Sequence, residues 1–375
     1  MSRISRRQML RGLLLGSVAL GTGSRAQDKS AVEDVVRAGE SGSKIIPPHG
    51  LPVEKPRLRD INRVIVDADP GNDDALAILL ALSTPALQVD AITVCPGNMG
   101  LDGYDQQVLN ALYTVDVAGK SGQVPVYRGV PKPILGRSWP VATFIHGSHG
   151  LGDVQVTEVD QQVEAENGID AMRRIVNDSP GEVTVLALGG LTNVAVAMLS
   201  DENFAKNLRG VVFVGGKYQN RGYSPGYNTL VDPEAAEVVM RSGAPLLLTG
   251  DAPREASLLL AEDFDHIASF NTPRSDFFIK SNALRRSYEM KYRGATGSVN
   301  YDPMAIAIAA DESIVHEYRS IYVKVELDGE YTRGTPVFGD DIYSGNPIPP
   351  GNVDICIRAD REKFKQMVFG TLRMN

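Results

Sequence analysis

Short apolar runs alternate with helix-like segments along most of the chain. Four runs are rich in β-branched residues and have the length of buried strands: residues 64–66, 89–94, 183–188 and 211–214. Amphipathic stretches lie between them, and this alternation is typical of a parallel sheet covered by helices. The pattern predicts an α/β protein with a parallel sheet.

The first predicted strand leads directly into an acidic segment, DADPGNDD at residues 67–74. Pro70 and Gly71 predict a turn inside it. The residues that follow recur at the spacing of one buried helix face: Ala75, Ile78, Leu79 and Leu82. The aspartates therefore fall between the carboxyl end of a strand and the start of a helix, where open α/β sheets form their ligand crevice.

These aspartates have two interpretations. Asp73 and Asp74 could simply complement the helix dipole, which is worth about 0.3 to 1 kcal/mol each. That effect does not account for Asp67 and Asp69, since crowded carboxylates repel one another unless a cation neutralises them. We therefore favour a site for a hard divalent cation with oxygen ligands, most simply Ca²⁺.

The N-terminal residues indicate an export signal. Residues 5–11 (SRRQMLR) resemble the twin-arginine pattern, an apolar stretch at 13–20 follows, and small residues near 24–26 suit a cleavage site. We expect residues 1–26 to be a removed signal peptide and the protein to be periplasmic or secreted. The alternative is an uncleaved basic tail. The apolar stretch is too short to span a bilayer, so we expect no stable membrane anchor.

The rest of the chain predicts one domain. Residues 27–60 are expected to be a leader, because residues 37–60 combine Pro, Gly and charge without periodicity. Residues 61–375 would form the catalytic domain. The 375 residues are 43% hydrophobic and carry a net charge of -8, which favours small molecules and cations over nucleic acid as partners. Two cysteines, Cys95 and Cys356, do not establish a disulfide.

Several segments together resemble the inosine-uridine-preferring nucleoside hydrolase family. The acidic segment 67–74 looks like the N-terminal signature of that family, and further segments agree in family order over most of residues 61–340. These are Pro96-Gly97-Asn98, residues 146–152 (HGSHGLG), residues 188–193 (LGGLTN), Asn228 ahead of residues 231–236 (VDPEAA), Asp302-Pro303, and residues 325–327 (VEL) leading to residues 332–334 (TRG).

The resemblance implies an α/β fold with an open, mostly parallel, Rossmann-like sheet and helices on both faces. It also implies hydrolysis of the N-glycosidic bond of a ribonucleoside at a single Ca²⁺. It implies that the metal ligands are Asp69, Asp74, the carbonyl of Leu188, and Asp302, and that Asp69 is also the general base. It implies further that the substrate-binding residues are Asp73, Asn98 and Asn228 at the ribose, Asn220 near the 5′ end, and His146 near the base. Family members are often dimers or tetramers, so a homo-oligomer is possible.

Two positions depart from the family pattern. Gly226 stands where many members have a glutamate that binds the ribose 5′-hydroxyl, and Tyr301 stands where inosine-uridine members have a histidine before the last calcium-binding aspartate. An aromatic ring at Tyr301 could stack on a base, which gives a slight preference for purine nucleosides. Gly226 together with Arg221 suggests a substrate that is modified at its 5′ end.

Other interpretations of the same residues stay open at this point. Asp302 ahead of Pro303 also suits the N-cap of a helix. The protein could be a calcium-dependent nucleoside- or ribose-binding protein with little turnover. It could also be a phosphatase with Asp67 as nucleophile, although that function explains the distant motifs poorly.

Overall fold

Strands from nearly the whole described length of the chain build one large sheet. The computed structural model describes residues 51–152, 154–216, 218, 225–294, 296–339 and 349–375. In this part of the chain, nine strands pair in the order β1-β10-β13-β7-β6-β5-β2-β3-β4. Their bounds are β1 Leu51–Val53, β2 Arg63–Ala68, β3 Gln88–Val94, β4 Val126–Arg128, β5 Val183–Ala187, β6 Gly210–Phe213, β7 Leu246–Leu248, β10 Val315–Ile321 and β13 Val353–Ala359.

The sheet is parallel except at one edge, where β1 and β10 run antiparallel to their neighbours. β3 and β4 lie on one side of β2, and β5, β6 and β7 follow in order on the other side. The chain therefore reverses its direction of travel across the sheet between β2 and β5. This is the Rossmann strand order, and it places a switch point beside the end of β2. The fold class expected from the sequence is confirmed.

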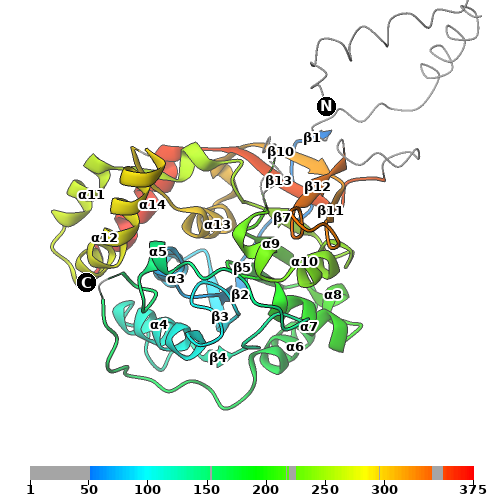
Figure 1. The fold of residues 1–375 in the computed structure, drawn as a ribbon, viewed down its shortest axis with the longest axis horizontal. Helices are drawn as coiled ribbons and strands as arrows, with labels where there is room; N and C mark the ends of the chain where they lie inside the picture. The colour runs from blue at the N-terminus through cyan, green and yellow to red at the C-terminus, as the bar shows by residue number, and fades with distance from the viewer. Residues whose placement is uncertain (1–50, 153, 217, 219–224, 295, 340–348) are drawn as a thin grey trace, which may run out of the picture. The chain divides into compact units, whose positions relative to one another are not determined.

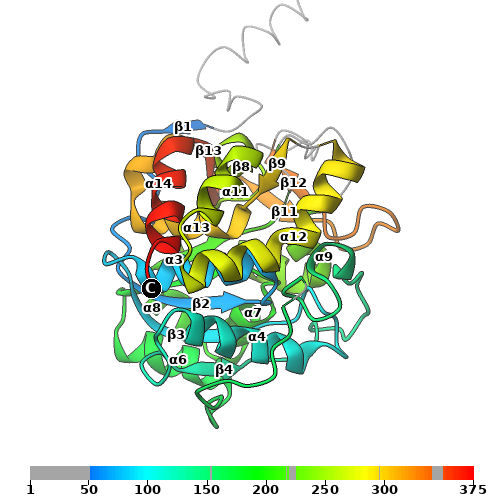
Figure 2. The ribbon, with the colours of Figure 1, turned by 90° about the vertical axis from the view of Figure 1, so that its left-hand side faces the viewer.

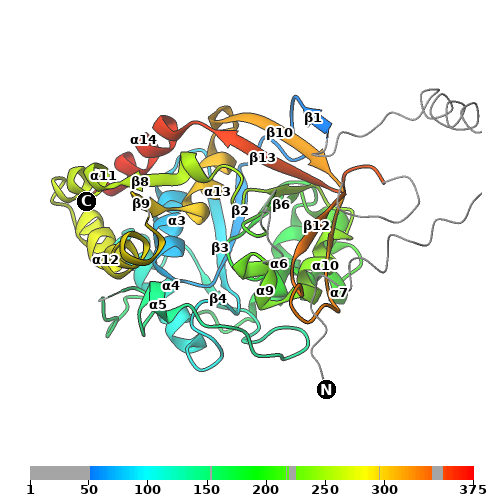
Figure 3. The same cartoon turned by 45° about the horizontal axis from the view of Figure 1, so that its top comes forward.

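Helices cover both faces of the sheet (Figures 1 and 3). One face packs against α3 (Asn72–Ser83), α4 (Tyr104–Val117), α13 (Tyr301–Ala310) and α14 (Arg361–Leu372). The other face packs against α6 (Gly168–Asp178), α7 (Thr192–Ser200) and α10 (Pro233–Met240). Within the described ranges, none of the helices combines the length and the apolar composition that crossing a bilayer requires.

The remaining helices and strands lie outside the nine-stranded sheet. α11 (Ala261–Ala268) and the long α12 (Pro273–Arg293) lie on the α3 side, as Figure 2 shows. Two small antiparallel pairs are β8 (Leu258–Leu260) with β9 (Gly297–Val299), and β11 (Val323–Val325) with β12 (Pro336–Phe338). The remaining short helices are α5 (Thr143–His146), α8 (Phe204–Asn207), α9 (Tyr227–Val231), η1 (Arg254–Ser257) and η2 (Glu312–Ile314).

α3 is more deeply buried than its sequence pattern predicts. The pattern indicates one buried face, but α3 is buried on nearly all sides, and Leu82 of the predicted face is only half-buried. The reason is that α4, α12, α13 and α14 all pack against α3 in addition to the sheet. The acidic start of α3 is therefore held inside the protein.

The folded domain begins earlier than Ile61, so the predicted leader is too long. β1 lies within it and pairs with β10. Leu58 is 2% exposed, and Arg57 binds the buried Asp354 through its backbone N–H at 2.7 Å and its Nε at 3.1 Å. The proline and charged residues of this segment give no periodic pattern, so neither the short edge strand β1 nor the buried Leu58 could be predicted from it.

The two cysteines are buried and unpaired. Cys95 follows β3 and Cys356 lies in β13, and four strands separate β3 from β13 in the sheet. At the spacing of neighbouring strands this is about 24 Å, far beyond the reach of a disulfide.

Truncating Leu58 tests whether residues 51–60 belong to the domain. Leu58→Ala should lower the free energy of unfolding by about 2 to 4 kcal/mol, because it leaves a cavity in the core. Arg59→Ala, next to it and exposed, should change it by less than about 0.5 kcal/mol. Urea unfolding of both variants measures the difference, and equal stabilities would place Leu58 outside the core.

Candidate active site

A cavity of about 710 Å³ opens at the carboxyl ends of the parallel strands. The strands β2, β3, β5, β6 and β7 each contribute a residue to its wall just beyond their last position: Asp69, Asn98, Leu188, Val214 and Gly250. The helices contribute Asp73, His146, Asn228, Arg285, Tyr301 and Asp302. The size is that of a small-molecule site. Every described residue that the sequence placed at the site lines this cavity, except Asp74, which is buried next to it.

Three carboxylates meet at the floor of the cavity. Oxygens of Asp73, Asp74 and Asp302 lie within 4.8 Å of one another. They converge because the first turns of α3 and α13 pack together. Asp302 is not the N-cap of α13, as one interpretation of the sequence had it; Asn300 holds that place, and Asp302 lies one residue inside the helix. A group of oxygen donors alone suits a hard divalent cation.

The Asp69 carboxylate lies beside these three carboxylates and is fixed by contacts of its own. Its Oδ2 accepts a hydrogen bond from the backbone N–H of Asn98 at 2.8 Å, and its own N–H donates to Asp74 Oδ1 at 3.2 Å. Gly97 and Gly189 pass so close that a Cβ on either would collide with the Asp69 carboxylate. Glycine is therefore needed at both positions, and the Asp69 side chain has little freedom to turn.

The four carboxylates differ in how their charge is balanced. Burial would raise the pKa of Asp73, but the Arg285 guanidinium at 2.7 Å holds it below its ordinary value. Burial and the neighbouring Asp73 raise the pKa of Asp74 to about 7. Burial and nearby carboxylates also raise the pKa values of Asp69 and Asp302 well above their usual range. Among the described residues, no Lys or Arg forms an ion pair with Asp69, Asp74 or Asp302.

Asn98 and Asn228 both turn their amide nitrogens toward the protein. Asn98 Nδ2 donates to the carbonyl of Asp69 at 3.0 Å and to Asp74 at 3.2 Å. Asn228 Nδ2 donates to the carbonyls of Leu188 and Val214. Each amide thus keeps its Oδ1 as the atom that can accept a hydrogen bond from a ligand. Asp73 adds a third acceptor, because its buried Oδ1 has no hydrogen-bond partner in the described part of the chain.

His146 lies in the wall of the cavity beside Asp73, and is buried rather than at the rim. Its Nδ1 is 3.3 Å from the backbone N of Asn72 and 3.7 Å from Asp73 Oδ1. Burial lowers the pKa of His146 to about 4, so the imidazole is neutral at pH 7. With Nδ1 engaged, Nε2 is the nitrogen left for a ligand.

The two departures from the family pattern have different surroundings. Tyr301 opens α13 and its half-buried side chain lines the cavity. At Gly226, a Cβ would collide with the backbone of Gly216, so a glutamate side chain does not fit there. The loss of that glutamate therefore does not by itself open space. Asn220 and Arg221 lie outside the residues that the structure describes.

Asp67 is not available as a nucleophile. It is fully buried, does not line the cavity, and its Oδ1 accepts hydrogen bonds from Thr93 at 2.6 Å and Asn193 at 2.7 Å. Burial raises the pKa of Asp67 to about 7. The phosphatase interpretation of this residue is wrong, because a phosphoryl group cannot reach it.

Four charged residues of the cavity wall have no signal in the sequence: Asp251, Arg254, Arg285 and Glu289. Arg285 and Glu289 come from the middle and end of α12, far along the chain from the acidic segment. Both are buried. A helix with charged residues throughout gives no indication of which ones face inward, so their roles emerge only from the fold.

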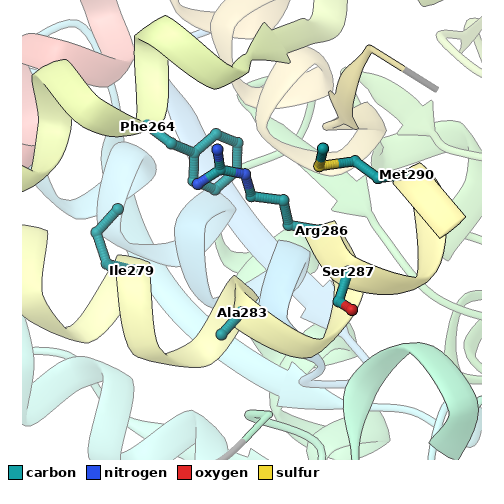
Figure 4. A pocket seen from close by; sticks show the side chains of 6 residues that line it. All are labelled: Phe264, Ile279, Ala283, Arg286, Ser287 and Met290. Atoms are coloured by element: carbon teal, nitrogen blue, oxygen red, sulfur yellow. The ribbon is translucent and has the colours of Figure 1, made fainter.

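A second hollow on the molecule has a different character. It holds about 310 Å³ between α11 and α12 and is lined by Phe264, Ile279, Ala283, Arg286, Ser287 and Met290 (Figure 4). The Arg286 guanidinium lies 4.8 Å from the centre of the Phe264 ring. No carboxylate lines this hollow, so the chemistry belongs to the larger cavity.

A doubly wound sheet with an acidic cavity at its switch point defines an open α/β protein that binds a small polar ligand at its strand ends. Comparison with known proteins gives the particular group. The family model for "inosine-uridine preferring nucleoside hydrolase" matches residues 64–366. The chain belongs to this family, and the enzyme class expected from its motifs, a ribonucleoside N-glycosidase, is confirmed.

Individual relatives differ in their named substrates. Uridine nucleosidase 1 of Arabidopsis thaliana is 33% identical over 71% of this chain and 79% of its own length. The pyrimidine-specific ribonucleoside hydrolase RihA of Salmonella arizonae is 32% identical over 83% of this chain and 98% of its own. The purine-preferring ribonucleoside hydrolase of Gardnerella vaginalis superposes with a TM-score of 0.74 at 27% identity, covering 83% of this chain and 98% of that one.

The uncompensated carboxylates predict a pH-dependent stability of the metal-free protein. Asp74 ionises near pH 4 when unfolded but near pH 7 when folded, so its contribution to stability is lost as pH rises from about 4 to 7. Asp69 and Asp302 act in the same direction. A saturating divalent cation such as Ca²⁺ should therefore raise Tm more at pH 7.5 than at pH 5.

Thermal unfolding with and without the cation measures this difference. In Asp74→Asn the metal-free protein should lose less stability over the same pH range. An equal cation-induced shift of Tm at pH 5 and pH 7.5 would contradict the electrostatic account.

Proposed function

We propose that this protein hydrolyses the N-glycosidic bond of ribonucleosides with the help of one bound Ca²⁺, with a slight preference for purine nucleosides. The observation that carries the proposal is the arrangement of the cavity floor. The buried carboxylates of Asp69, Asp74 and Asp302 have no ion-pair partner in the described part of the chain. They lie beside three hydrogen-bond acceptors that suit sugar hydroxyls, on Asp73, Asn98 and Asn228. The family membership of the chain supports it.

The ligands of the ion follow from the balance of charge. Asp73 is already neutralised by Arg285, so it has the least need of a metal. Asp69, Asp74 and Asp302 are the carboxylates with raised pKa values, and a cation would remove their mutual repulsion. We assign these three and the carbonyl of Leu188 as ligands. When bound, Ca²⁺ supplies positive charge that orients vicinal hydroxyls and lowers the pKa of a water molecule.

The ribose is held by acceptors. Asp73 Oδ1, Asn98 Oδ1 and Asn228 Oδ1 each accept a hydrogen bond from a sugar hydroxyl. Cleavage passes through a ribosyl group with oxocarbenium character, and the anionic carboxylates next to the ring stabilise this positive charge.

Asp69 is the general base of the proposal. It is ionised once a cation lies beside it, and the carboxylate then takes a proton from the water that attacks the anomeric carbon. The hydrogen bond from Asn98 and the close approach of Gly97 and Gly189 keep the carboxylate aimed at one place. The slight preference for purines rests on the Tyr301 ring in the cavity wall, since an aromatic side chain can stack on the larger base.

A nucleoside panel tests the function directly. Inosine, adenosine, guanosine, uridine and cytidine are each incubated with the Ca²⁺-loaded protein, and free base and ribose are measured. We expect multiple turnovers, higher kcat/KM for purine nucleosides, and loss of activity after chelation that added Ca²⁺ restores. Tight binding without turnover would instead indicate a binding protein.

Two substitutions distinguish the loss of the general base from the loss of a calcium ligand. Asp69→Asn should lower kcat by roughly 10²- to 10⁴-fold at any Ca²⁺ concentration, because the proton acceptor is lost. Asp302→Asn should weaken Ca²⁺ binding by more than about 100-fold and regain activity as Ca²⁺ is raised. Asp276→Asn, exposed on α12, is the control and should match the unaltered protein. Full recovery of Asp69→Asn at high Ca²⁺ would rule out a role as base.

A further inference from the structure

Glu289 carries a buried carboxylate that belongs neither to the proposed metal ligands nor to the proposed ribose acceptors. It lies in the last turn of α12, is 3% exposed, and lines the large cavity. Its Oε2 has no hydrogen-bond partner in the described part of the chain. A buried carboxylate oxygen without a donor is costly, and a ligand that supplies the donor would remove that cost.

Arg285 satisfies Glu289 only in part. The Arg285 Nε lies 3.6 Å from Glu289 Oε1, which is an ion pair but too long for a hydrogen bond. The Arg285 Nη1 pairs with Asp73 at 2.7 Å, and Nη2 donates to the carbonyl of Val299. Arg285 is therefore committed to the cavity floor, and the outer oxygen of Glu289 is left for another partner.

Glu289 lies beyond the cavity floor along α12. It is one helical turn, about 6 Å along the axis of α12, past the arginine that pairs with Asp73. Its neighbour Tyr288 packs against Phe144 with ring centroids 5.0 Å apart, and Phe144 is 50% exposed and lines the same cavity. Tyr301 lines this cavity too. Glu289 thus shares the cavity with aromatic rings, which suit a planar base.

We propose that Glu289 is a specificity-determining residue that accepts a hydrogen bond from an N–H group of the leaving base. The inference rests on the proposed function and adds to it the kind of base that is preferred. A 6-oxopurine presents an N1–H donor on the edge opposite the sugar, and guanine adds a 2-amino group beside it, so that two donors match the two oxygens of one carboxylate. A base without an N–H leaves Glu289 unpaired in the closed site.

The test compares purine nucleosides with and without this donor. The Ca²⁺-loaded full chain is assayed for kcat/KM with guanosine, inosine, 1-methylinosine, in which a methyl group replaces the N1 hydrogen, and purine riboside, which has no N–H on its base. The unaltered protein should favour guanosine and inosine over the other two by about 10- to 100-fold.

Glu289→Gln should lower kcat/KM for guanosine and inosine by about tenfold or more, mainly through KM, and change purine riboside by less than about threefold. Asp276→Asn, an acidic residue on the exposed side of the same helix, should leave all four values unchanged. Thermal unfolding checks that each variant is folded.

Several results would overturn the inference. An equal loss with all four substrates would make Glu289 a structural counter-ion of Arg285, and no loss with any would give it no role. If Glu289→Gln does not fold, equal kcat/KM for inosine and 1-methylinosine in the unaltered protein still contradicts the inference. Failure of the proposed function is distinct, because then neither the unaltered protein nor Asp276→Asn releases base from any of the four or from uridine and cytidine.

Discussion

The repulsion between buried carboxylates is the constraint on which this site depends. Asp69, Asp73, Asp74 and Asp302 are held together by backbone geometry, through the packing of α3 on α13 and the close approach of two glycines. Of these four, Arg285 forms an ion pair with Asp73 alone in the described part of the chain. The site thus has more negative than positive charge. A hard cation would bind with high affinity because it relieves the repulsion between these carboxylates. Filling the site and stabilising the fold are one process.

The division of labour among the aspartates follows from the same imbalance. In the proposed function, a carboxylate with a fixed guanidinium partner, such as Asp73, stays ionised and presents a lone pair to neutral hydroxyl groups. Asp69, Asp74 and Asp302 have no such partner, so a bound cation would be needed to balance their charge. Adjacent residues such as Asp73 and Asp74 therefore serve different ends, and the arginine that separates their roles comes from α12, a distant part of the chain.

The parts of the site that depend on residues close together in the chain could be predicted from the sequence. The strand before the acidic segment, the turn at Pro70-Gly71 and the helix after it all form, and strand ends with recognisable motifs converge as the sheet topology requires. The burial of α3 on all sides, the inward position of Arg285 and the place of Asp302 inside its helix were not predictable, because each is decided by packing between distant segments. Leu58 shows the same limit at the start of the domain.

The short strand β1 has a consequence for the surface of the molecule. It pairs with residues 318–320 of the seven-residue β10, so that the sheet ends in strands of only three residues, β1 on one side and β4 on the other. Unpaired backbone along a long strand is a template for association with a second chain. The segment ahead of Ile61 therefore shields part of a strand edge, and removal of residues 51–60 would expose that edge and favour aggregation.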